Sequence, residues 1–193
     1  MEPKEPLRNS IFIFLLIVLT QCNTRQSASL LSLNADSVAI LTKEGSTYVN
    51  GNLFSGKLFT LYANKDTSEI RNYVDGKETG EWKEFYENKQ LKEIRYFDNG
   101  KKQGKYVAWW ENGKQKLEYN FLNDEYDGVC REWSSTGMLT KEMNYVAGHE
   151  SGTERTWFDD GSVKSNYVIK NGRRYGLLGT KNCVNVTDSV FKK

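Results

Sequence analysis

The sequence contains little of what a catalytic or metal site requires. Among its 193 residues there is one histidine, His149, and there are three cysteines, none of them in the CxxC or CxxH spacing of a metal site. His149 lies in the turn-like segment AGHESG, without a second histidine with which to share a metal or relay a proton. No serine has an evident triad. These shortages predict a protein that is not an enzyme and that uses no metal or cofactor.

The sequence also has few prolines and almost no net charge. The 27 basic and 25 acidic residues nearly cancel, which excludes strong electrostatic attraction to nucleic acid. With two prolines and 13% aromatic residues, the chain has ample apolar surface to bury and is expected to fold. Glu84, Glu132 and Glu154 fall on predicted strands with Lys or Arg beside them, which favours solvated or paired charges over the acid pair of a glycosidase.

A long hydrophobic run occurs once, near the N-terminus. Two basic residues precede the apolar run 11–19, which is too short to span a membrane comfortably and has the length of a signal-peptide core. The run ends in LTQC, which resembles a bacterial lipobox, although Gln21 stands where a small residue is usual. We therefore predict a lipoprotein signal peptide at 1–21, a lipidated Cys22, and a place in the cell envelope facing outside the cytoplasm. An uncleaved anchor or a plain secretory signal are the alternatives.

A fixed period dominates the rest of the chain. Six glycines lie 24 residues apart: Gly56, Gly80, Gly104, Gly128, Gly152 and Gly176. Five residues after each of the first five stands a large apolar side chain, in order Leu61, Phe85, Trp109, Trp133 and Trp157, and the next positions hold Tyr62, Tyr86, Trp110, Ser134 and Phe158. A period between 20 and 50 residues is typical of repeat architectures.

Within each period the pattern predicts a β-hairpin. Nine residues after the spacing glycine, three copies carry a turn glycine, while the first two carry Lys65 and Lys89. The segments between turns are short and rich in aromatic and β-branched residues, as in strands at 105–110 and 116–121. A tyrosine near the end of each unit is expected to close it: Tyr73, Tyr96, Tyr119, Tyr145 and Tyr167. The predicted fold class is all-β, an elongated antiparallel β-meander of about six 24-residue hairpin repeats.

The unit aromatic-x-x-G-x-x-x-G-x-W/Y-x-x-W/F-Y/W-x-x-G-x-L resembles the MORN-repeat-variant family, some members of which are labelled antitoxin-like. The resemblance covers about 48–181, which leaves 22–47 as a linker and lead-in and 182–193 as a C-terminal cap or tail. It implies an elongated antiparallel β-meander with a binding or scaffolding role.

Three functions remain open from the sequence. The first is an envelope scaffold or adaptor that binds a protein partner along its sheet and contacts the membrane through its lipid. The second is an antitoxin or immunity protein, and the third is glycan capture. The candidate binding residues are the large rings, Phe85, Trp109, Trp110, Trp133 and Trp157, which either pack a thin sheet or form an exposed strip. Cys130 is expected to be a small core residue, and whether it bonds to Cys183 is left open.

Overall fold

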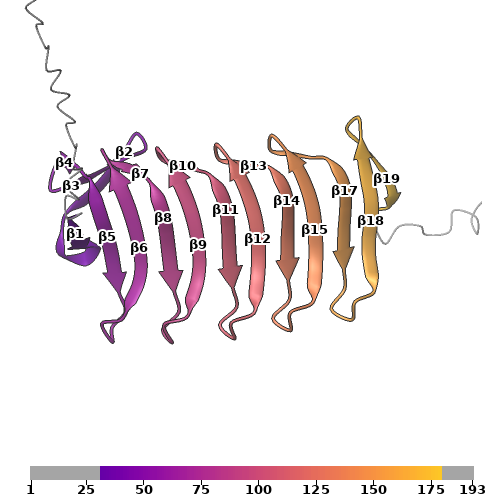
Figure 1. Cartoon of the computed structure of the whole chain (residues 1–193), viewed down its shortest axis with the longest axis horizontal. Helices are drawn as coiled ribbons and strands as arrows, with labels where there is room; N and C mark the ends of the chain where they lie inside the picture. Colours follow the sequence, from indigo (N-terminus) through magenta and orange to yellow (C-terminus); the bar gives the residue numbers. More distant parts are fainter. Residues whose placement is uncertain (1–30, 180–193) are drawn as a thin grey trace, which may run out of the picture.

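The structure is a computed structural model and describes residues 31–179. Its main body is one long sheet of five consecutive antiparallel hairpins (Figure 1). The paired long strands are β5 (Gly56–Leu61) and β6 (Thr67–Val74), β8 (Gly80–Phe85) and β9 (Leu91–Asp98), β11 (Gly104–Trp109) and β12 (Gln115–Leu122), β14 (Gly128–Trp133) and β15 (Leu139–Val146), β17 (Gly152–Trp157) and β18 (Val163–Lys170). A single strand, β19 (Arg173–Leu177), ends the sheet. The predicted all-β antiparallel meander is confirmed, and no helix within 31–179 is long and apolar enough to cross a bilayer.

A two-residue turn and a short strand connect each hairpin to the next. The short strands are β7 (Lys77–Glu78), β10 (Lys101–Lys102), β13 (Glu125–Tyr126) and β16 (His149–Glu150). Before β7, Asp75 and Gly76 have φ of 48° and 76°, and before β10, Asn99 and Gly100 have 49° and 80°. Positive φ at both central residues is the geometry of a type I′ turn, which Asn, Asp and Gly favour. The residue types at these positions therefore explain the predicted turns between repeats.

The spacing glycines sit where each short strand gives way to the next long strand. Gly80, Gly104, Gly128 and Gly152 have φ between 64° and 86°, a left-handed conformation that strains any residue with a side chain. Gly176 differs, because it lies inside β19 with φ of 125° and begins no strand. The described residues thus hold five complete hairpins and one terminal strand, where the period predicted about six hairpins.

The left-handed glycine also interrupts the ladder of backbone hydrogen bonds between hairpins. Asparagine side chains supply hydrogen bonds at this point instead. The Nδ2 groups of Asn72 and Asn120 donate hydrogen bonds of 2.6 and 2.7 Å to the carbonyl oxygens of Glu81 and Val129 in the next hairpin. Asn144 makes the equivalent bond to the carbonyl of Thr153. The second hairpin carries Tyr96 at this place, so it has no amide to donate there.

At the other end of each hairpin, the turn has the same geometry in all five copies. In the first copy Lys65 N donates to Tyr62 O at 2.9 Å, and Tyr62 N donates to Asp66 O at 2.8 Å. The fourth turn residue is left-handed throughout, with φ of 68° at Lys65 and Lys89 and 79° at Gly113. The β-bulge that follows lets this turn match the strand twist. Lysine can occupy the position, but glycine suits it better.

The buried side chains lie on one face of the sheet, which we call the covered face. The row opposite the spacing glycines consists of Tyr73, Phe97, Phe121, Tyr145 and Ile169. Tyr96, expected to close its unit, instead lies on the other face and is 37% exposed, since side chains alternate along a strand. Tyr126 of β13 packs its ring on Phe121, with centroids 4.8 Å apart. Cys130 is 1% exposed, as expected of a small core residue.

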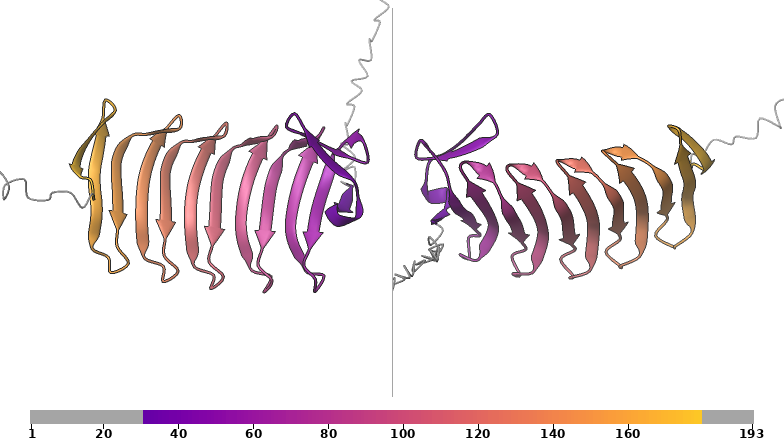
Figure 2. Two further views of the ribbon diagram at one scale, coloured as in Figure 1. Left: turned by 180° about the vertical axis from the view of Figure 1, so that it is seen from behind. Right: turned by 45° about the horizontal axis from the view of Figure 1, so that its top comes forward.

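A small cap covers the N-terminal end of the sheet (Figure 2). It comprises β1 (Ser32–Asn34), which pairs parallel with β5, the 3-10 turn η1 (Ala35–Ser37), and a separate three-stranded sheet of β2 (Ile40–Lys43), β3 (Ser46–Val49) and β4 (Asn52–Leu53). Val49 and Phe54 of the cap pack against Leu58 and Tyr73 of the first hairpin. Most of these residues fall in the predicted linker and lead-in at 22–47, because such short strands carry no clear periodicity. The predictions for 1–21, Cys22, Cys183 and 182–193 lie outside the described residues.

Candidate functional site

The candidate rings gather at the edge of the sheet formed by the five long-hairpin turns, which we call the turn edge. Phe85, Trp109, Trp133 and Trp157 each end the first strand of a hairpin, at the point where the register shifts. All four are half-buried, and so is Trp110, the first residue of its turn. The structure therefore brings the five predicted residues to one edge, but as partly packed rings.

A row of hydrogen bonds, the clasp row, joins neighbouring hairpins along the turn edge. Tyr62 Oη donates to the carbonyl oxygen of Phe85 at 2.6 Å, and Tyr86 Oη donates to that of Trp109 at 2.8 Å. Trp110 Nε1 donates to the carbonyl oxygen of Trp133 at 3.0 Å. These rings occupy one lattice position in three successive hairpins, so their polar atoms fasten each hairpin to the next.

The clasp row stops at the fourth hairpin. Ser134 takes the lattice position of the rings, and its short side chain bonds inside its own turn, 2.7 Å from Thr136 Oγ1. In the fifth hairpin the position holds Phe158, which has no polar atom to donate. The joint between the fourth and fifth hairpins accordingly lacks the clasp that the first three joints have.

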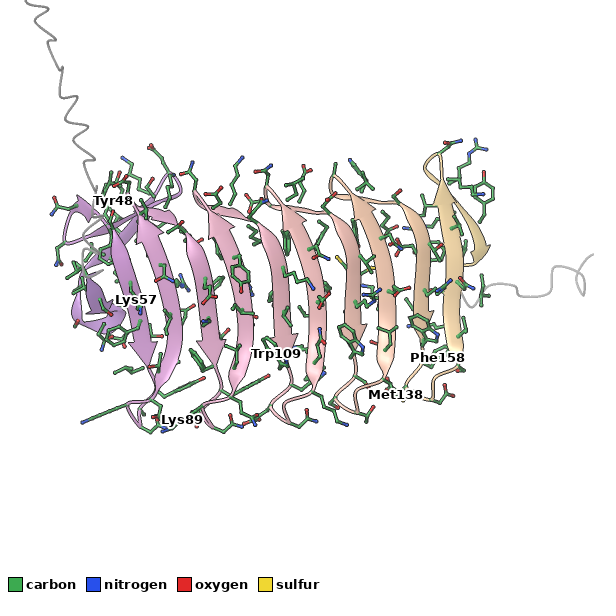
Figure 3. The ribbon with its side chains drawn as sticks, viewed as in Figure 1. Tyr48, Lys57, Lys89, Trp109, Met138 and Phe158 are labelled. Atoms are coloured by element: carbon green, nitrogen blue, oxygen red, sulfur yellow. The ribbon has the colours of Figure 1, made fainter. Side chains whose placement is uncertain are left out.

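An exposed apolar patch begins where the clasp row ends. Phe158 is 51% exposed, Val163 50% and Met138 37%. Met138 Cε lies 3.1 Å from the place that a Cβ on Gly161 would occupy, so its side chain reaches the next turn. Trp157 pairs in register with Val163. We call Met138, Trp157, Phe158 and Val163 the C-terminal patch; Figure 3 shows Met138 and Phe158 at the turn edge.

Polar side chains form a second cluster, on the covered face of the first three hairpins. Arg95 lies between two rings, 4.4 Å from the centroids of both Trp82 and Tyr106, and pairs with Glu93 at 2.6 Å. Tyr106 Oη donates to Glu93 at 2.7 Å. Burial, and then this bond to Glu93, raise the pKa of Tyr106 to about 12. The tyrosine is thus a fixed hydrogen-bond donor, and the cluster braces the hairpins by stacking and ion pairing.

The acidic residues singled out in the sequence do not behave alike. Glu84 pairs with Lys92 at 2.6 Å and Glu132 with Lys141 at 3.2 Å, which confirms the predicted paired charges. Glu154 contradicts that prediction, because it is 1% exposed and its Oε2 has no hydrogen-bond partner among residues 31–179. Burial raises the pKa of Glu154. It occupies the lattice position of Leu58 and Cys130, an inward-facing place that a carboxylate fills poorly.

No group of three or more potential metal ligands comes together within 31–179. His149 is exposed, at the start of β16 beside a type I′ turn.

Comparison with known proteins gives a match to a protein family and matches to solved structures. No curated protein matches the chain. A crystal structure of a point mutant of S. aureus TarM, in complex with fondaparinux, alpha-GlcNAc-glycerol and UDP, matches 57% of this chain and 21% of its own at 13% identity and a TM-score of 0.33. This chain therefore spans about a fifth of the length of that protein.

The family described as "MORN repeat variant" matches residues 78–101. The match runs from the end of β7 through the second hairpin to the start of β10, and so covers one full period of the lattice. The resemblance drawn from the sequence is confirmed for this unit, and the repeat at 78–101 is a MORN repeat variant.

Proposed function

We propose that this chain is a non-enzymatic, lipid-anchored envelope protein that binds a protein partner through the C-terminal patch. The MORN-variant repeat supports a repeat protein of a kind that often binds membranes or proteins. A sheet one strand-layer thick, built from equal hairpins, offers a long rigid surface and favours binding over a reaction pocket. The lipidated Cys22 would hold this surface at the membrane.

The exposure of Phe158 carries the proposal. The rings at its lattice position in the first three hairpins, Tyr62, Tyr86 and Trp110, are half-buried and hydrogen-bonded. Phe158 is half exposed, and Met138 and Val163 of the C-terminal patch are exposed as well. Clustered aromatic and aliphatic side chains on a rigid edge are the usual anchors of protein interfaces.

The test is affinity purification of the tagged full chain from detergent-solubilised native membranes. We expect one dominant co-purifying protein, lost when Phe158→Ser and Val163→Ser are combined. Val74→Ser is the matched control, because Val74 is also a valine, also 50% exposed, but ends β6 at the opposite edge of the sheet. Retention of the partner by the double variant, loss with the control, or capture of polysaccharide alone would contradict the proposal.

The membrane anchor is tested separately. Metabolic labelling with a fatty acid is expected to mark the wild-type chain and to be abolished by Cys22→Ala, which also moves the protein to the soluble fraction. Membrane retention of the Cys22→Ala chain would instead indicate an uncleaved anchor.

A further inference from the structure

Two adjoining hollows lie where the cap meets the covered face of the long sheet. The first, of about 240 Å³, is lined mostly by polar residues and glycines: Thr42, Gly45, Thr47, Arg71, Tyr73, Gly76, Glu78 and Gly100. The second, of about 230 Å³, shares four of these residues and is also lined by the apolar Ala35, Ile40 and Leu58. In size the pair falls within the range of small-molecule sites, with a polar end and an apolar end.

The guanidinium of Arg71 is common to both hollows and is held from one side. Its Nε and Nη2 donate to the same oxygen of Glu69, at 2.9 and 2.7 Å. Its Cζ lies 4.8 Å from the centroid of the Trp82 ring. The Tyr73 hydroxyl also interacts with the guanidinium and helps to raise the pKa of Arg71, and no other residue within 31–179 takes up the remaining N–H groups. A fixed guanidinium with unused N–H groups is suited to receive a carboxylate.

Glu78, at the end of β7, supplies the opposite charge in the polar hollow. Its carboxylate makes no hydrogen bond or ion pair within 31–179. Burial raises its pKa, against the lowering effect of Arg71 and other nearby cations. A half-buried carboxylate that has lost water without gaining a hydrogen-bond donor is suited to accept a hydrogen bond from a ligand.

The same lining argues against two other ligand classes. Among the lining residues a phosphate would meet one cation, Arg71, against the carboxylates of Glu69 and Glu78. Among the lining residues a sugar would find only Phe59 on which to stack, since Tyr73 is 3% exposed and packs edge-on against Phe54. What the hollows match is a molecule with both charges and an apolar group.

We propose that this cleft binds a free α-amino acid with an apolar side chain. The carboxylate of the ligand contacts Arg71 Nη1 and its ammonium contacts Glu78. Its side chain enters the second hollow beside Ile40 and Leu58. Thr47 and Tyr73, which line both hollows with Arg71, are buried, and the Tyr73 hydroxyl interacts with both Arg71 and Thr47.

The test is isothermal titration calorimetry of the full chain with L-leucine, alongside N-acetyl-L-leucine, L-leucinamide, glucose and inorganic phosphate. We expect L-leucine to bind and each modified leucine, lacking one charge, to bind about tenfold more weakly or worse. Glu78→Gln is expected to weaken L-leucine binding by the same factor. Glu150→Gln, the same residue type at the same lattice place in β16, is expected to leave it unchanged.

The folding of each variant is checked by its thermal transition, so that a loss of binding is separated from a loss of folded protein. The proposal is overturned if L-leucine does not bind up to its solubility limit, if N-acetyl-L-leucine binds equally well, or if a Glu78→Gln chain with a normal transition binds as wild type does. Binding of glucose or phosphate in place of L-leucine would also overturn it.

Discussion

Replacing Lys65 by glycine is expected to stabilise the protein. Lys65 has φ of 68° in the first long-hairpin turn, where the third hairpin has Gly113 with φ of 79°. A side chain in this conformation costs about 1–2 kcal/mol, while glycine costs about 0.4–1 kcal/mol through the flexibility that it adds to the unfolded chain. The difference predicts that Lys65→Gly raises the free energy of unfolding by about 1 kcal/mol.

Lys89 provides a graded comparison at the same lattice position. Its φ is also 68°, but its Nζ lies 2.9 Å from Asp66 Oδ1 in an exposed ion pair worth a few tenths of a kcal/mol, so Lys89→Gly should gain less than Lys65→Gly. Gly113→Lys should lose about 1 kcal/mol, since no atom lies within 4 Å of the added Cβ and only the backbone conformation resists it.

The assay is urea unfolding followed by tryptophan fluorescence, with the dependence on urea concentration compared between variants. Lys65→Ala is the control, because it removes the lysine but keeps the strained conformation, and it should not stabilise. Equal effects of Lys65→Ala and Lys65→Gly, or a neutral Gly113→Lys, would refute the reasoning from backbone conformation.

Three further predictions concern stability and are read from the same unfolding curves. Tyr96→Asn should add about 0.5–1 kcal/mol to the free energy of unfolding by supplying the side-chain amide that the second hairpin lacks. No gain would mean that water already donates to the backbone carbonyl that this amide would reach in the third hairpin. Trp110→Phe should cost about 1 kcal/mol by removing one clasp, whereas Ser134→Tyr should add a clasp to the carbonyl of Trp157 and stabilise. Burial raises the pKa of Glu154 above its ordinary 4.5, so at this residue the folded state binds more protons than the unfolded state, and its contribution to stability is fully present below pH 4.5 and is lost as the pH rises through the raised pKa. Glu154→Gln should flatten this fall; an unchanged pH profile would show that the carboxylate is not desolvated.

The period of 24 residues was enough to predict the hairpins, their turns and the antiparallel order. Glycine at a fixed spacing has a physical cause that sequence reasoning can use, because few other residues tolerate a left-handed backbone. Which residues form the buried row on the covered face was harder to predict. Tyr96 and Phe97 are adjacent rings, and one residue of register decides which of them is buried.

Other features depend on contacts that no local pattern encodes. The cap strands are two to four residues long, too short for periodicity to show. The burial of Glu154 violates the rule that charges face water, so a prediction from residue type was bound to miss it. The exposure of Phe158 depends on its neighbours in the row, because Ser134 precedes it and no hairpin follows it within the described residues, and this is evident only when the clasps of the preceding hairpins are known.

The clasp row has a consequence for how such a chain can change in length. Each clasp joins residues 23 positions apart, and the second and third hairpins each carry both the ring that donates and the carbonyl that accepts. Duplicating or deleting either of these two units would therefore leave the remaining clasps intact and alter the span by roughly 9.6 Å, twice the distance between neighbouring strands. An insertion of any other size would put a donor out of reach of its acceptor. The sheet can therefore lengthen or shorten without losing a clasp only in steps of one unit.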